Sequence, residues 1–130
     1  MTLLAVLPNP YDRAMLHRIV DGASWDLQFA SSVDEALKVL DGDEHQPEMI
    51  LSDRRFADGR GWRDLLAKLS ELKSPSALVV TDDSEGGDLW GEVLNLGGCD
   101  VLPKPFRWTE VSHAVDHALR HSRAKLAAAA

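Results

Sequence analysis

The chain has 130 residues, 45% of them hydrophobic and 27% charged, which is an ordinary balance for one globular domain with one core. Its formal net charge of −7 disfavours direct binding of DNA or RNA, because nucleic-acid binders usually present a basic face. A single cysteine, Cys99, excludes an internal disulfide, and no apolar run approaches the roughly 18 residues of a membrane-spanning helix.

The N-terminal segment lacks the charged start and long apolar stretch of a signal peptide, so we expect a cytoplasmic location. Residues 2–7 form an apolar run of strand length, and Asn9 followed by Pro10 is typical of a helix start. The spacing predicts that this helix ends near Gly22 and buries four residues, Ala14, Met15, Leu16 and Ile19. A second strand is expected over 25–29, where Trp25, Leu27 and Phe29 alternate.

A capping-box pattern, Ser32 with Glu35, predicts a second helix that ends at Gly42. Its expected apolar face is formed by Val33, Ala36, Leu37 and Leu40. The run from Met49 to Asp53 then reads as a short strand that is buried on both faces and ends in a carboxylate. Asp53 would lie at the carboxyl edge of a parallel sheet, where such sheets bind ligands, or it would simply cap the following turn.

The second half of the chain repeats the alternation of helix and strand. A helix beginning at Trp62 and broken by Pro75 has one apolar face, made by Trp62, Leu65, Leu66, Leu69 and Leu72. A strand over 77–81 precedes a helix that carries Leu89, Trp90, Val93 and Leu94. A short strand over 100–102 leads into Pro103-Lys104-Pro105, and the last helix, from about Trp108, carries Val111, Ala114, Val115, Ala118 and Leu119.

The end of the chain is rich in alanine from Ala124. We therefore expect one domain over residues 1–123, followed over 124–130 by a helix extension, a linker or a cloning remnant. Strand and helix alternate throughout this domain, which implies right-handed crossovers and a single three-layer α/β fold with a parallel sheet covered by helices on both faces.

Three polar residues end successive strands of this sheet: Asp53, Thr81 and Lys104. An aspartate can attack phosphorus as a nucleophile, while a hydroxyl and an ammonium hold phosphoryl oxygens beside a Mg²⁺ ion. Each residue also has a structural explanation, as a turn cap, a strand former or a solvated lysine. Their joint position at strand ends favours a phosphate-handling site.

The chain resembles the receiver domains of two-component response regulators over about residues 3–121. The resemblance rests on the segments 50–53, 58–61, 78–81 and 97–106, the last of which is the most specific. It implies a flavodoxin-like fold with strand order 2-1-3-4-5. It also implies that Asp53 accepts a phosphoryl group from a histidine kinase or phosphotransfer protein, with Thr81 and Lys104 contacting that group and Mg²⁺ held by Asp53 and the backbone carbonyl of Arg55.

The resemblance implies two further features: a cis peptide bond between Lys104 and Pro105, and a partner-binding surface made by the fourth helix, the fifth strand and the fifth helix. Trp90 and Trp108 lie near this surface, as interface residues or as buried anchors.

Several positions depart from the family's pattern. Leu7 and Pro8 replace the acidic pair that holds Mg²⁺, Asp82 replaces a small residue, and Val101 replaces the aromatic residue that changes rotamer on activation. Asn9 and Asp12 are the nearest polar substitutes, although both fall where the first helix starts. Mg²⁺ is therefore a doubtful cofactor, and we expect slow or absent phosphorylation by small phosphodonors.

Three functions stay open on this basis. The first is a phosphorylatable receiver with impaired Mg²⁺ binding, and the second is a phosphorylation-independent pseudo-receiver that acts as an interaction module. The third is a small flavodoxin-like or phosphatase-like enzyme, which residues 8–11 disfavour because they offer no glycine for a phosphate-binding loop. We therefore expect a protein that is not an enzyme.

Other charged groups have two interpretations each. Arg54, Arg55 or Arg13 could pair with Asp53 in place of a metal, or they could be solvated. The stripe of His113, His117 and His121 could bind a metal, although a solvated helix face is the commoner meaning of such spacing.

Overall fold

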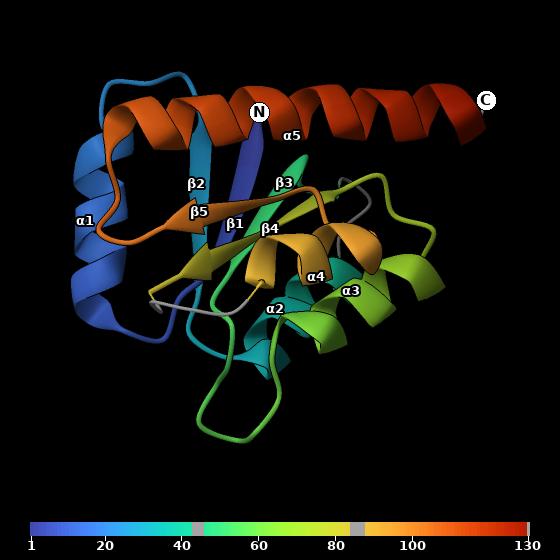
Figure 1. The fold of residues 1–130 in the computed structure, drawn as a ribbon, viewed down its shortest axis with the longest axis horizontal. Coiled ribbons are helices and arrows are strands. Elements are labelled where there is room, and N and C mark those ends of the chain that lie inside the picture. The colour runs from blue at the N-terminus through green and yellow to red at the C-terminus, as the bar shows by residue number, and fades with distance from the viewer. Residues whose placement is uncertain (43–45, 84–87, 130) are drawn as a thin grey trace.

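The computed structural model describes residues 1–42, 46–83 and 88–129 (Figure 1). Within them, strands and helices alternate in the order β1 (Thr2–Val6), α1 (Pro10–Val20), β2 (Asp26–Ala30), α2 (Val33–Gly42), β3 (Met49–Ser52), α3 (Trp62–Glu71), β4 (Ala77–Asp82), α4 (Leu89–Asn95), β5 (Asp100–Pro103) and α5 (Trp108–Ala129).

The strands form one parallel sheet in the order β2-β1-β3-β4-β5, which confirms the predicted fold class and strand order. The register aligns Leu51 of β3 with Ala5 of β1 and with Val79 of β4, and Val79 in turn with Asp100 of β5. All strands point the same way, so the residues that follow β1, β3, β4 and β5 gather at one edge of the sheet.

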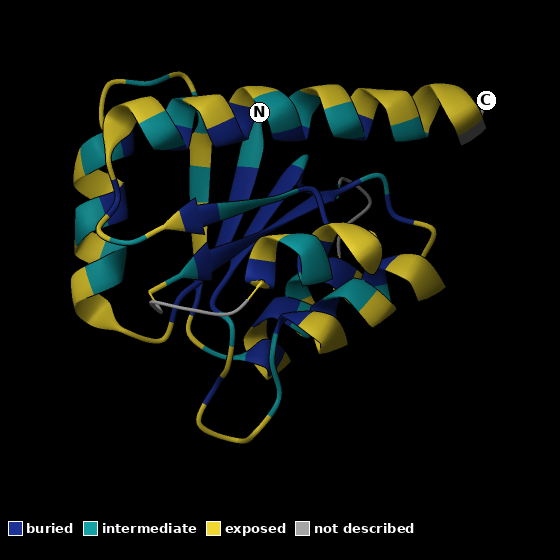
Figure 2. Ribbon diagram, viewed as in Figure 1, coloured by how far each residue is buried: buried dark blue, intermediate teal, exposed yellow. Residues whose placement is uncertain are grey.

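Helices cover both faces of the sheet, α1 and α5 on one side and α2, α3 and α4 on the other (Figure 1). Alternate strand residues feed two cores. In β3, Met49 and Leu51 pack with α1 and α5, whereas Ile50 packs with the other three helices. All four residues of β3 are buried, as Figure 2 also shows for the central strands, and this explains the uninterrupted apolar run of its sequence.

Strand β2 lies at the edge of the sheet, and its alternating pattern does not produce a buried face. Phe29 is 36% exposed and Leu27 is half-buried, while Ala30 is the buried residue of the strand. The prediction that Phe29 alternates inward with Trp25 and Leu27 is therefore wrong. The helices cover an edge strand less completely than a central one.

In several helices the buried residues differ slightly from those that the sequence predicted. In α1 the buried residues are Leu16 and Val20, with Met15 and Ile19 half-buried, and Ala14 is exposed. Leu72, the residue after the end of α3, is also exposed. In α4, Leu89 and Val93 carry the packing and leave Trp90 exposed.

Helix α5 begins at Trp108, as expected, and continues through the alanine-rich segment to Ala129. Trp108 is half exposed and stacks on Trp25, with ring centroids 5.6 Å apart and planes 20° from parallel. Across the described residues, no helix combines the length and the apolarity needed to cross a membrane.

Candidate functional site

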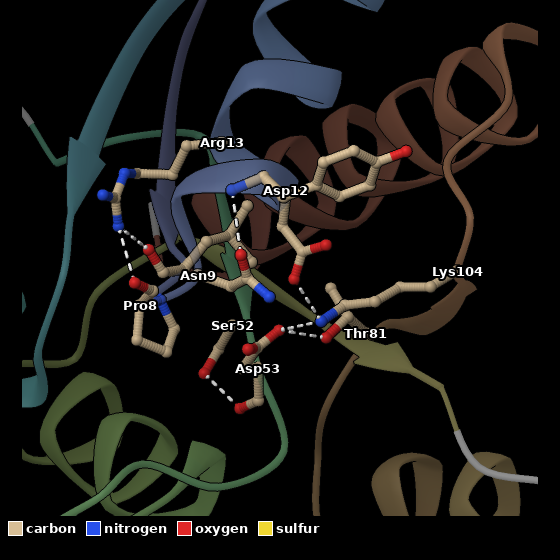
Figure 3. Close-up of polar contacts among 10 residues, drawn as sticks. Pro8, Asn9, Asp12, Arg13, Ser52, Asp53, Thr81 and Lys104 are labelled. Atoms are coloured by element: carbon tan, nitrogen blue, oxygen red, sulfur yellow. Dashed lines mark hydrogen bonds and ion pairs between the residues drawn. The ribbon is translucent and has the colours of Figure 1, made fainter.

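The ends of β3, β4 and β5 bring together the three residues that the sequence singled out (Figure 3). The Thr81 hydroxyl donates a hydrogen bond of 2.6 Å to Asp53 Oδ1, and Lys104 Nζ lies 2.9 Å from the same oxygen. Asp53 directly follows β3, Thr81 is the fifth residue of β4, and Lys104 directly follows β5. The parallel register therefore places a carboxylate, a hydroxyl and an ammonium at one point of the sheet edge.

A second carboxylate, Asp12, contacts the same lysine. Lys104 Nζ donates to Asp12 Oδ2 at 2.7 Å, so the ammonium lies between Asp12 and Asp53 (Figure 3). Burial alone would lower the pKa of Lys104, but its hydrogen bonds and ion pairs with Asp12 and Asp53 outweigh that effect and raise this pKa. From the sequence, Asp12 was only a residue at the start of the first helix. The first turn of α1 lies over the sheet edge, so an acidic residue in that turn is the sequence signal for this contact with the site.

Asp53 lines a pocket beside this cluster. Among the described residues both contacts of the Asp53 carboxylate are made through Oδ1, and the side chain remains 12% exposed. The pocket has a volume of about 340 Å³ and is lined by Asp53, Arg54, Arg55, Thr81, Asp83 and Lys104. Asp83 is a further carboxylate among these lining residues.

Comparisons with known proteins agree with this architecture. A receiver domain protein from Clostridium thermocellum superposes with a TM-score of 0.82 at 15% identity, over 94% of this chain and 96% of that one. NtrX from Brucella abortus superposes with a TM-score of 0.84 at 18% identity, over 98% of this chain and 29% of NtrX. The fold is that of a response regulator receiver domain.

A sequence relative points to the same family. The two-component response regulator ORR21 of Oryza sativa is 27% identical over 120 residues, which is 92% of this chain and 17% of that protein. The chain thus spans about a sixth of the length of this curated relative. No protein-family model matches the chain.

The residues after β1 do not fit the metal site of a receiver domain. Leu7 is fully buried among α1 and α5 residues, and Pro8 is exposed but has no side-chain oxygen. The backbone carbonyls of both accept hydrogen bonds from Arg13 Nη1, at 2.7 Å and 2.9 Å. Mg²⁺ requires near-octahedral oxygen ligands. Within the described residues, no group of three or more histidine, cysteine, aspartate or glutamate side chains could hold a metal ion.

The polar substitutes considered for this metal site have other roles. Asn9 Oδ1 accepts the backbone N–H of Tyr11 at 2.8 Å and so serves as the N-cap of α1. Asp12 binds Lys104, as described above. Of the residues that the receiver resemblance implied as metal ligands, Asp53 and Arg55 line the pocket.

The other predicted features have mixed outcomes. The Lys104–Pro105 peptide bond is cis, which confirms the expectation for this turn of a receiver domain. Lys104, not Arg13, forms the ion pair at Asp53, while Arg54 and Arg55 line the pocket. His117 Nδ1 lies 3.2 Å from Asp100 Oδ2, so the histidine stripe contributes one interaction between α5 and β5.

Proposed function

We propose that this chain is a non-enzymatic signalling module whose Asp53 accepts a phosphoryl group, with little assistance from Mg²⁺. One observation carries this proposal: Thr81 and Lys104 both contact Oδ1 of Asp53 at hydrogen-bond distance, and all three residues line one pocket. By analogy with the receiver domains that it resembles, the donor would be the phosphohistidine of a histidine kinase or of a phosphotransfer protein.

The proposed step is a displacement at phosphorus. Asp53 Oδ2 attacks the phosphorus atom, a new P–O bond forms, and the P–N bond to the donor imidazole breaks, with its electron pair leaving on the nitrogen. Thr81 and Lys104, which contact Asp53 Oδ1, would hold the phosphoryl oxygens. Mg²⁺, when bound in such a site, supplies charge neutralisation. The poor ligand set here predicts a weak dependence of the transfer on this ion.

Treatment with phosphoramidate, which like phosphohistidine carries a P–N bond, tests the proposal. We expect slow addition of one phosphoryl group, observed by intact-mass measurement, at a rate that Mg²⁺ hardly changes. Asp53→Asn should abolish the addition, because it removes the nucleophilic oxygen. Rapid, strictly Mg²⁺-dependent addition to the wild-type protein would contradict the impaired metal site.

The second candidate function is a phosphorylation-independent pseudo-receiver. It is supported by Leu7 and Pro8 after β1 and by the half-buried Val101, a β-branched residue that cannot swing as an aromatic residue does. If folded protein gains no phosphoryl group after prolonged treatment with phosphoramidate and Mg²⁺, this second function replaces the first.

For either function we propose that protein partners bind the surface made by α4, β5 and α5. Trp90 is 58% exposed there, and exposed tryptophans are frequent interface hot spots. With a phosphotransfer protein as the probe, Trp90→Ala should weaken binding without unfolding the domain. Tyr11→Ala is the matched control, since Tyr11 is 68% exposed on α1. Loss of binding in Tyr11→Ala alone would place the interface on the other side.

A further inference from the structure

We propose that the Lys104 ammonium occupies the cation position between the Asp12 and Asp53 carboxylates and thereby excludes divalent metal ions from Asp53. The inference goes beyond the proposed function, because it states which cation these carboxylates hold, whether or not Asp53 is phosphorylated. It assigns the weak role of Mg²⁺ to a residue that is present, in addition to the ligands that are missing at Leu7 and Pro8.

Lys104 makes the contacts that a bound cation would make in this cluster. Its Nζ atom lies 2.7 Å from Asp12 Oδ2 and 2.9 Å from Asp53 Oδ1, so one positive charge bridges two carboxylates (Figure 3). The side chains of all three residues are at most 16% exposed. Opposite charges attract strongly at such distances where little solvent screens them. A metal ion could bind these two oxygens only by displacing the ammonium.

The backbone holds both sides of this bridge in place. The N–H of Lys104 donates to the carbonyl of Asp82 at 2.9 Å, which continues the pairing of β5 with β4. On the other side, Arg13 Nη1 donates to the carbonyl of Leu7 at 2.7 Å, which ties the first turn of α1, with Asp12, to the end of β1. The lysine side chain therefore stays near both carboxylates, at an effective concentration on the order of millimolar or above.

Mg²⁺ competes poorly against this tethered cation. The ion needs near-octahedral oxygen ligands and gives up its bound water reluctantly. Asp53 Oδ1 already accepts from both Thr81 and Lys104, at 2.6 Å and 2.9 Å. In the described part of the chain, no third histidine, cysteine, aspartate or glutamate joins Asp12 and Asp53 in a metal-binding group. A metal ion would therefore have to break an ion pair at each carboxylate and would gain a small set of ligands in return.

Lys68 provides a matched control, because it also lies between two carboxylates. Its Nζ atom is 2.9 Å from Asp41 Oδ1 and 3.8 Å from Glu71 Oε1. The side chains of Asp41 and Glu71 are 54% and 70% exposed, so water already solvates their charges. Lys68→Met removes the same charge from the chain as Lys104→Met but should open no cation site. The two variants therefore separate a specific cation position from a general rise in negative charge.

Titration of the full chain with Mn²⁺, which takes the same oxygen ligands as Mg²⁺, tests the inference by electron paramagnetic resonance of the free ion. We expect wild type and Lys68→Met to bind Mn²⁺ equally weakly. Lys104→Met should bind one Mn²⁺ at least about tenfold more tightly, since the ion no longer has to break a charge-assisted hydrogen bond, which contributes about that factor. Adding Asp12→Asn to Lys104→Met should remove this gain.

Lys104→Met leaves two largely buried carboxylates without their counter-ion, so its folding is followed by circular dichroism. Lys104→Gln, which keeps a hydrogen-bond donor for one carboxylate, is the second variant. In both Lys104 variants Mn²⁺ should raise the unfolding temperature, because an ion that binds only the folded protein stabilises it. Mn²⁺ should leave the unfolding temperature of Lys68→Met unchanged.

Three results would overturn the inference: Mn²⁺ binding by wild type as tight as by Lys104→Met, an equal gain in Lys68→Met, or no gain in either Lys104 variant. If both Lys104 variants stay unfolded in the presence of Mn²⁺, the ion does not replace the ammonium, and the inference is also wrong. These results differ from failure of the proposed function, which is scored by covalent phosphorylation of Asp53 with phosphoramidate.

Discussion

Lys104 lies between two carboxylates that are far apart in the sequence, and this arrangement controls its ionisation. The side chains of Lys104, Asp12 and Asp53 are only 16%, 14% and 12% exposed, so solvent screens their charges weakly. Asp12 holds the ammonium from the α1 side, while the same ammonium lies 2.9 Å from Asp53 Oδ1. We therefore regard Asp12 as a positioning residue for Lys104.

Asp12→Asn should remove about 1.5–3 kcal/mol from the free energy of unfolding at neutral pH, because it replaces a charge-assisted hydrogen bond in a largely buried site. The pKa of Lys104 is raised above its ordinary value of 10.5. Its contribution to stability is therefore complete below that pH and is lost as the pH rises through the higher pKa of the folded state. Urea unfolding from neutral pH to pH 12 should show a smaller alkaline loss in the variant.

The control for this substitution is Asp58→Asn, which removes a carboxylate from an exposed ion pair with Arg60. Exposed pairs contribute little to stability, so its unfolding curve should match that of the wild type. Equal alkaline losses in wild type and Asp12→Asn would show that Asp12 does not raise the pKa of Lys104.

At the scale of elements, the loop between β3 and α3 depends on a close backbone crossing at Gly61. Gly61→Ala should destabilise the domain by about 1–3 kcal/mol, because the added methyl group would displace the backbone of Arg54. Gly42→Ala, at the end of α2, meets open space and should be neutral or stabilise the domain. Urea titration of both variants makes the comparison, and equal midpoints would show that the crossing is loose.

Helix α4 offers a second comparison, between two neighbouring residues. Leu89 is 2% exposed and packs against the sheet, so Leu89→Ala should cost about 2–5 kcal/mol. Trp90 points outward, and Trp90→Ala should change the free energy of unfolding by less than about 0.5 kcal/mol despite its larger volume. A comparable loss in Trp90→Ala, measured by thermal unfolding, would show that the indole ring supports the fold.

For the whole molecule, the poor ligand set predicts that Mg²⁺ does not stabilise the native state. A ligand that binds only the folded protein raises its unfolding temperature, so wild type should unfold at the same temperature in MgCl₂ and in NaCl of equal ionic strength. Pro8→Asp adds an exposed carboxylate next to the site and should produce a Mg²⁺-dependent rise. A clear rise in the wild type would reveal a site that its side chains do not suggest.

Leu7→Asp is a poorer way to rebuild the acidic pair. Leu7 is fully buried in the core beneath α1 and α5, and a carboxylate there would be desolvated without a partner. We expect this variant, alone or combined with Pro8→Asp, to unfold at a much lower temperature than Pro8→Asp. The burial of Leu7 means that acidic side chains at both positions would require the end of β1 to repack.

Much of the architecture follows from local sequence patterns. The apolar run of β3, the heptad-like spacing of Trp62, Leu65 and Leu69, and the turns between them are properties of neighbouring residues, so they predict the elements and the α/β alternation directly. The convergence of Asp53, Thr81 and Lys104 was predictable for a related reason: parallel strands place their carboxyl ends at one edge of the sheet.

The tertiary structure decided which groups meet at that edge. Asp12 and Lys104 are 92 positions apart, and only the packing of α1 over the sheet brings them into contact. The same packing turns Arg13 toward the carbonyls of Leu7 and Pro8, and the edge position of β2 exposes Phe29. Side-chain partners and the depth of burial depend on how elements are placed against one another, and the periodicity of a single segment carries no information about its distant neighbours.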